Sequence, residues 1–187
     1  MRWIAQLRGR EAGAGLAWCR GFLDDFETSD LEWIRIDLGR GQYEGVYGRC
    51  WYPSEDRPTF RISCQVPGPF PCDILTRKPP LYRRPDGTFP RAPRGSRRGI
   101  HVHDERRGRQ WYRVISQTRV ETLDEGIVWI LAHEAFHFLR KTRQVPGRNN
   151  EIEADRFADA KLEGFRESSV RIVSSRLNDQ LILPFSH

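Results

Sequence analysis

Strand-like segments precede helix-like segments along this chain, and that order predicts an α+β domain. Between residues 31 and 66, apolar and polar side chains alternate with the period of two that is typical of strands. After residue 121, capping signals and apolar stretches indicate helices. At 187 residues the chain is long enough for one domain with a hydrophobic core and short for two, so we expect a single domain over 1–187.

Three strands are expected in the strand-rich part of the domain, residues 31–66. Leu31–Leu38 alternates, two glycines then predict a turn, and Tyr43–Tyr52 runs back from it. A short loop leads to a third strand at Thr59–Val66. The simplest arrangement of three consecutive strands is an antiparallel meander, so we expect an N-terminal antiparallel sheet.

Residues 67–108 are expected to form a basic, Pro- and Gly-rich loop region, because eight prolines interrupt this stretch. Only Gly99–His103 within it has the composition of a strand. Loops of this length are uncommon inside compact domains unless they are functional or mobile. A longer strand is expected after it, at Arg109–Val120, which opens the last part of the domain, 109–187.

The net charge of +6 is concentrated in one segment. Between Arg77 and Arg113 the chain carries 12 Lys and Arg against three acidic residues, a local charge of +9, which leaves −3 for the remainder. Such a segment could contact nucleic acid or an acidic partner, since Lys and Arg bind phosphates with salt-sensitive affinity. A solvated loop that covers a cleft is the alternative, and no stacked aromatic series runs through the segment.

One helix in the last part of the chain has strong boundary signals. Thr122–Glu125 has the form of a capping box, and the helix that it begins should run to about Arg143, before Pro146 and Gly147 end it. Its apolar residues point all round the helix rather than along one stripe. A helix that is apolar on every side is buried.

Three other helices are expected. They run from about Glu11 to Phe26, from Asn149 or Asn150 onward, and from about Ser168 to Leu181. The second of these carries acidic residues in its first turns, which suit the positive end of the helix dipole.

The cysteines and the amino-terminal residues bear on location. None of the four cysteines forms a Cys-x-x-Cys pair, and the first residues contain no apolar run of signal-peptide length. No window has the length of a membrane-spanning helix, so no membrane association is expected. We expect a cytoplasmic protein with reduced thiols, while the even cysteine count leaves disulfides open for an exported protein.

The segment His133–His137 has the H-E-x-x-H pattern inside the helix with strong boundary signals. Residues four apart share a helix face, so His133 and His137 can reach one zinc ion about 2 Å from each nitrogen. Glu134 is placed to activate a zinc-bound water without being a ligand. A chance match is the alternative. Burying two imidazoles and a carboxylate without a partner would cost several kcal/mol, and a bound metal would remove that cost.

A catalytic zinc also needs a third protein ligand and one open position. Downstream, the chain reads Asn150-Glu151-Ile152-Glu153-Ala154-Asp155. H-E-x-x-H followed by N-E-x-x-x-D resembles the gluzincin zinc metallopeptidases, the thermolysin-like group, over residues 133–155. The resemblance implies a zincin-like fold with an active-site helix and a glutamate helix, Glu151 as third ligand and Asp155 as the residue that orients His133. Glu153 is the competing ligand, although it lies nearly opposite Glu151 on the helix and has no Asp four residues later.

Other implications of the resemblance are less specific. The family's edge strand, which holds the substrate backbone, would correspond to Arg109–Val120. The family also supplies a residue that stabilises the oxyanion, and the candidates by location are Tyr112, Arg113, His101 and His103. For the two histidines a place in a solvated loop is the alternative. The spacing of 14 residues from His137 to Glu151 is similar to that of small single-domain members of the group.

The sequence therefore predicts a zinc-dependent endopeptidase that hydrolyses protein or peptide substrates with one catalytic Zn²⁺ and Glu134 as general base. Two alternatives belong to other classes. One is a regulatory or nucleic-acid-associated binding protein that keeps the zinc fold with narrow or no proteolytic activity. The other is a nucleic-acid-binding protein with a structural metal, which requires a closed fourth coordination position.

Overall fold

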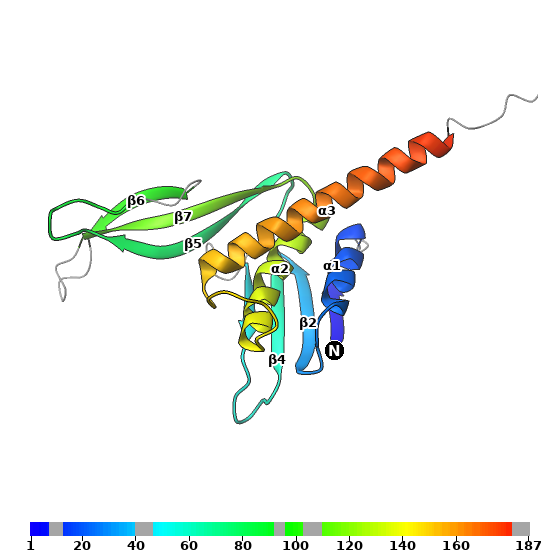
Figure 1. Ribbon diagram of the computed structural model, residues 1–187, viewed down its shortest axis with the longest axis horizontal. Helices are drawn as coiled ribbons and strands as arrows, with labels where there is room; N and C mark the ends of the chain where they lie inside the picture. Colours follow the sequence, from blue (N-terminus) through cyan, green and yellow to red (C-terminus); the bar gives the residue numbers. More distant parts are fainter. Residues whose placement is uncertain (8–12, 40–46, 92–95, 103–109, 181–187) are drawn as a thin grey trace, which may run out of the picture.

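The computed structural model describes residues 1–7, 13–39, 47–91, 96–102 and 110–180, except the side chains of 77–80, 96–102, 112–114, 116 and 171–180 (Figure 1). Its elements in chain order are β1 (Arg2–Gln6), α1 (Ala14–Asp24), β2 (Leu31–Leu38), β3 (Gly48–Trp51), β4 (Phe60–Val66), β5 (Cys72–Tyr82), β6 (Ser96–Val102), β7 (Gln110–Val120), α2 (Leu123–Lys141) and α3 (Glu151–Gln180). The architecture is α+β, as predicted, although β1 and α1 precede the expected strands.

A four-stranded sheet, with the strand order β1-β2-β4-β3, forms with the helices the part of the molecule here called the body. β1, β2 and β4 are parallel and only β3 is antiparallel to its neighbour, so the predicted antiparallel meander is wrong. The inner side chains of β2 and β4, such as Ile34 and Ile62, are completely buried. These two apolar strands take the centre and pair in parallel, which leaves β3, with its exposed Trp51, at the edge. Alternation fixes which face of a strand is buried but not which strand lies beside it.

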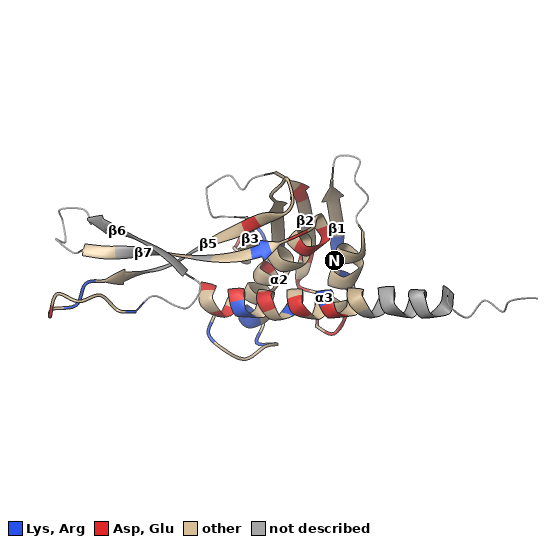
Figure 2. Ribbon diagram, turned by 90° about the horizontal axis from the view of Figure 1, so that it is seen from above, with Lys and Arg blue, Asp and Glu red and all other residues tan. Residues whose placement is uncertain are grey.

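Helix α2 packs against the sheet and is the centre of the core. Every residue from Gly126 to Leu139 is buried, which confirms the prediction of a helix enclosed on all sides. Figure 2 shows the sheet, α2 and α3 in successive layers. At its start, Thr122 Oγ1 accepts from the Glu125 backbone N–H over 3.2 Å, as a capping box requires, whereas the Glu125 carboxylate accepts from Glu121 N–H rather than from Thr122. Among the described residues, no helix is both long and apolar enough to cross a bilayer.

The region 67–108 was predicted as a loop with one strand-like segment, and its described residues contain two strands, β5 and β6. β5, β7 and β6 form a separate three-stranded sheet in that order, with both outer strands antiparallel to β7. The register of β5 shifts between Lys78 and Leu81, where Pro79 and Pro80 stand. Because β5 is an edge strand, this irregularity accommodates two residues that cannot donate to the ladder. β6 covers most of the predicted Gly99–His103 strand, and His103 lies outside the described residues.

Helix α3 is continuous, so the separate helix predicted from Ser168 does not exist. Ser168 and Ser169 donate their hydroxyls to the Phe165 carbonyl within the helix, over 2.7 and 3.0 Å. Their side chains are satisfied inside a helix, rather than capping a new one.

Candidate metal centre

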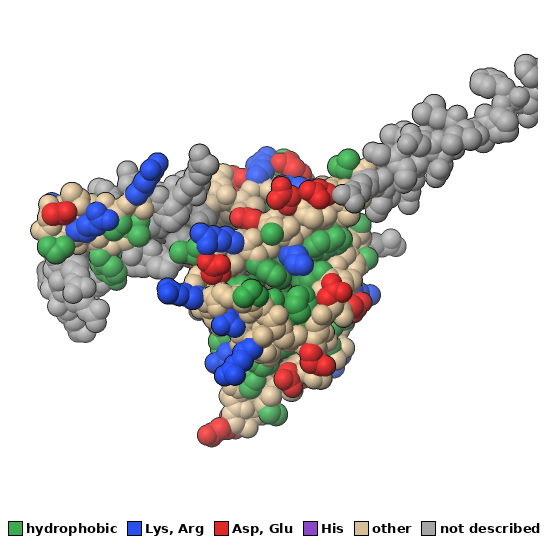
Figure 3. Space-filling model, in the orientation of Figure 1, with side chains coloured by type: hydrophobic (Ala, Val, Ile, Leu, Met, Phe, Trp, Pro, Cys, Tyr) green, Lys and Arg blue, Asp and Glu red, His purple; other side chains and the backbone are tan. Residues whose placement is uncertain are grey.

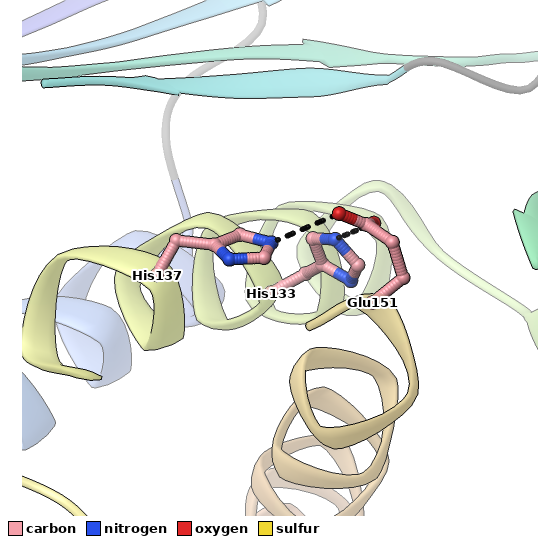
Figure 4. A group of neighbouring side chains, drawn as sticks. All are labelled: His133, His137 and Glu151. Carbon is pink, nitrogen blue, oxygen red and sulfur yellow. Dashed lines mark hydrogen bonds and ion pairs between the residues drawn. The ribbon is translucent and has the colours of Figure 1, made fainter. Parts of the chain in front are cut away.

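Three side chains from two helices converge on one another (Figure 4). His133 and His137 lie one turn apart on α2 and are 6% and 9% exposed. Glu151 begins α3 and points back at both rings: its Oε2 lies 3.2 Å from His133 Nε2, and its Oε1 lies 3.5 Å from His137 Nε2. The ligand atoms of the three residues all lie within 4.8 Å of one another.

These separations would allow the three side chains to hold one metal ion. With bonds of about 2.0–2.1 Å, two ligand atoms of a tetrahedral centre lie about 3.3 Å apart. The Glu151 carboxylate lies at similar distances from the two rings, 3.2 Å from His133 through Oε2 and 3.5 Å from His137 through Oε1. Two neutral imidazoles and one carboxylate are also the donor set of several catalytic zinc sites.

The other nitrogen of each imidazole faces an acceptor. His133 Nδ1 lies 2.9 Å from Asp155 Oδ1, and His137 Nδ1 is hydrogen-bonded to Asn149 Oδ1 over 2.7 Å. A proton on each Nδ1 leaves both Nε2 lone pairs directed at the Glu151 carboxylate, which is the tautomer that metal binding requires. Asp155 is itself held by Thr76, whose hydroxyl donates to Oδ2 over 2.8 Å.

The chain between α2 and α3 places Glu151. The side chain of Arg140 donates to the carbonyls of Val145 and Gly147 and so ties this turn to the end of α2. Gly147 has φ of +105°, a conformation that favours glycine. Asn150 then caps α3, since its Oδ1 accepts from the backbone N–H groups of two residues in the first turn.

Glu153, the competing ligand, is not part of the group. Its carboxylate accepts from Arg156 over 2.7 Å, one turn along the same helix. The structure therefore brings Glu151, and not Glu153, together with His133 and His137.

Glu134 lies in one cleft with the two histidines and Glu151, buried beneath the edge strand. A Cβ atom added to Gly48 of β3 would stand 2.6 Å from its Cγ and 2.7 Å from its Oε1, so the strand passes in direct contact with this side chain. The Cys50 backbone N–H donates to the carboxylate. Burial, and secondarily the charge of Glu151, raise the pKa of Glu134 to about 8.

The cleft has a volume of about 360 Å³. Trp129 is one of its lining residues; it stacks on His133 with ring centroids 5.4 Å apart and donates its indole N–H to Asp159 over 2.7 Å. The lining residues come from β3, β5, α2 and α3 and the chain beside β3: Tyr47, Gly48, Arg49, Cys50, Tyr52, Thr76, Trp129, Ile130, His133, Glu134, His137 and Glu151.

Two residues of the centre carry no local sequence signal. Asn149 was expected only as a helix cap, yet it joins His137 to Tyr52, because its Nδ2 donates to the Tyr52 hydroxyl over 2.9 Å. Tyr52 follows β3 in the chain, and only the fold of the sheet brings it to the cleft.

The proposed oxyanion residues are placed only in part. Tyr112 and Arg113 belong to β7 and His101 to β6, with side chains outside the description, and His103 lies outside the described residues altogether. The expectation that 109–120 is an edge strand is wrong, because β7 lies between β5 and β6. The edge strand beside Glu134 is β3. It is the last strand in the order of the larger sheet, and among the described strands it pairs only with β4.

Comparisons with protein-family models, with curated proteins and with solved structures find no match for this chain.

Proposed function

We propose that this protein is a zinc-dependent endopeptidase of the gluzincin type, with His133, His137 and Glu151 as ligands. One observation supports it above the others. Both Nε2 atoms are directed at one carboxylate while both Nδ1 atoms face acceptors, an arrangement expected of residues that share a metal ion. A chance H-E-x-x-H pattern on a buried helix would not be expected to orient all four imidazole nitrogens in this way.

A zinc ion at this centre would supply a Lewis acid and lower the pKa of a bound water. Glu134 then acts as general base and takes a proton from water. Its burial suits that role, because a carboxyl whose pKa lies near neutrality can both accept a proton and return it to the leaving amine. Asp155 and Asn149 hold the orientation of His133 and His137.

The edge strand β3 is the part of the cleft suited to a peptide substrate. An extended substrate segment can add to a free sheet edge through main-chain hydrogen bonds. β3 is antiparallel to β4 and in contact with Glu134, so a peptide paired along it would run past the proposed base. β3 therefore takes the substrate-binding role that was expected for the strand at 109–120.

The replacement of Glu134 with Gln tests the proposal. It keeps the shape of the side chain but removes the base, so turnover of a peptide library should fall by about 10²–10⁴-fold while bound zinc, measured by elemental analysis, stays at one ion per chain. Wild-type protein that binds zinc but cleaves no peptide would instead favour a binding protein that keeps the zinc fold. A protein without zinc affinity would reject both.

A structural metal is the weaker alternative. Such a site requires a fourth protein ligand, whereas the group found among the described residues has three members. Metal substitution by Co²⁺ and its visible spectrum would separate three protein ligands from four.

A further inference from the structure

A basic arm stands beside the cleft. The sheet β5-β7-β6, here called the arm, extends away from the body in Figure 1, and its inner end is fixed to α3. Thr76 of β5 lines the cleft and donates to Asp155, and Thr118 of β7 donates to Asp159 over 3.1 Å. A molecule bound along the arm would therefore be held next to the metal centre.

The fold gathers basic residues from separate segments into adjacent rows of the arm. Arg77 of β5 and Arg97 of β6 both pair with Ile115 of β7. In the next row, which by strand alternation belongs to the opposite face of the sheet, Lys78 and Arg98 both pair with Val114. Neighbouring strands lie about 4.8 Å apart, so the two basic positions of each row are about 10 Å apart.

No acidic residue offsets this charge within the paired segments 76–82, 96–102 and 110–116. The segment that follows β5 adds exposed Arg83, Arg84 and Arg91 against Asp86. Figure 3 shows blue side chains at the far end of the arm, away from the body. Uncompensated positive charge gathered on one element produces a field that attracts a polyanion.

The basic residues of the arm are suited to phosphate as the anion. Of the 12 basic residues between Arg77 and Arg113, 11 are Arg and one is Lys. The guanidinium group presents a planar fork of donors that matches phosphate oxygens bidentately. The rest of the chain is similar in this respect, since 17 of its 19 basic residues are Arg.

An aromatic pair lies on the same sheet. Tyr82 and Trp111 are cross-strand partners at the outer part of β5 and β7, and Tyr82 is 40% exposed. Aromatic rings beside basic residues offer a surface on which bases stack, a feature that an acidic peptide or a lipid headgroup cannot use.

We propose that the arm binds nucleic acid, with its arginines on the phosphates. This inference goes beyond the proposed peptidase activity and does not depend on the metal. If both hold, the enzyme is directed at proteins that are associated with nucleic acid, because the arm begins at the cleft.

Fluorescence anisotropy with a labelled 20-nucleotide single strand and a 20-base-pair duplex, titrated at several salt concentrations, tests the proposal. The full chain carrying Glu134→Gln avoids proteolysis during the measurement. The affinity should fall linearly with the logarithm of salt concentration, with a slope of about −0.7 per contacted phosphate for a single strand and about −0.9 for a duplex. Stronger binding of the single strand would indicate base stacking, and stronger binding of the duplex would indicate phosphate contacts alone.

The decisive variant carries Arg77→Gln, Lys78→Gln, Arg97→Gln and Arg98→Gln. The matched control carries Arg20→Gln, Arg57→Gln, Lys141→Gln and Arg148→Gln, four exposed residues spread over the body, with the same change in net charge. The arm variant should lose at least tenfold in affinity and show a shallower salt dependence, while the control stays within about threefold.

Three outcomes would overturn the proposal: wild-type protein that does not bind either probe, equal losses in the two variants, or tighter binding to phosphatidylserine vesicles or polyglutamate than to nucleic acid. The first and third need no variant, so they hold even if the arm variant does not fold. Peptidase activity on a free peptide is a separate readout, and its absence would count against the proposed function alone.

Discussion

His133 Nδ1 lies 2.9 Å from Asp155 Oδ1, and Asp155 stands one helical turn after Glu151 on α3. The same helix therefore presents one carboxylate to each side of the His133 ring. Glu151 faces Nε2, where a metal would bind, and Asp155 faces Nδ1, where the proton must stay. The position and the protonation of this histidine are both set by α3.

Asp155→Asn should weaken zinc binding by about 10–100-fold without abolishing it, because the amide retains the shape but loses the charge that favours a proton on Nδ1. Competition with a chromophoric chelator measures the affinity. Asp37→Asn is the control, since Asp37 pairs with Arg35 on the sheet and has no part in the centre. Equal affinities of wild type and Asp155→Asn would mean that Asp155 does not act on His133.

Glu151→Ala should release zinc far more readily than Glu153→Ala. The first removes one of three converging ligand atoms, whereas the second removes an exposed ion pair with Arg156, which contributes at most about 1 kcal/mol to stability. Zinc content after dialysis against a weak chelator distinguishes the two variants. The same content in both would reject Glu151 as the ligand.

The parts of the centre that could be predicted from the sequence are those with helical spacing. His133 and His137 are four residues apart, as are Glu151 and Asp155, and helix geometry alone places each pair on one face. The capping signals at Thr122 and Asn150 similarly locate the two helices.

The remaining parts depend on contacts between segments far apart in the chain. The closeness of Gly48 to Glu134 is set by the pairing of β3 with β4, and alternation does not specify the partner or the direction of a strand. Likewise, Asn149 meets Tyr52 across 97 positions of sequence. The prolines of β5 suggested a loop, since proline is excluded from central strands. The prediction failed because β5 is an edge strand with an irregular register at Pro79 and Pro80, and such a strand tolerates proline.

The metal-free protein should become less stable as pH rises from about 5 to 8. Folding raises the pKa of Glu134 from 4.5 to about 8, mainly through burial, so between these values the folded state holds a proton that the unfolded state has lost. The free energy of unfolding then falls with rising pH by at most about 1.4 kcal/mol per unit from this group. Thermal unfolding at several pH values, compared between wild type and Glu134→Gln, isolates the contribution. Parallel pH profiles in the two proteins would contradict it.

Gly48→Ala should impair the centre, although Gly48 is neither a ligand nor a catalytic group. The new Cβ would stand 2.6 Å from Glu134 Cγ, closer than real Cβ contacts, so either β3 or the Glu134 side chain must shift. Such overpacking costs about 1–3 kcal/mol, and displacement of the base lowers turnover further. Gly21→Ala is the matched control: Gly21 is in α1 with nothing within 4 Å of an added Cβ, and alanine there should stabilise the helix by about 0.5–1 kcal/mol. Unfolding midpoints and peptide turnover of both variants test the contact. A Gly48→Ala protein as stable and as active as Gly21→Ala would mean that β3 does not press on Glu134, and the edge strand would lose its proposed place beside the reacting peptide bond.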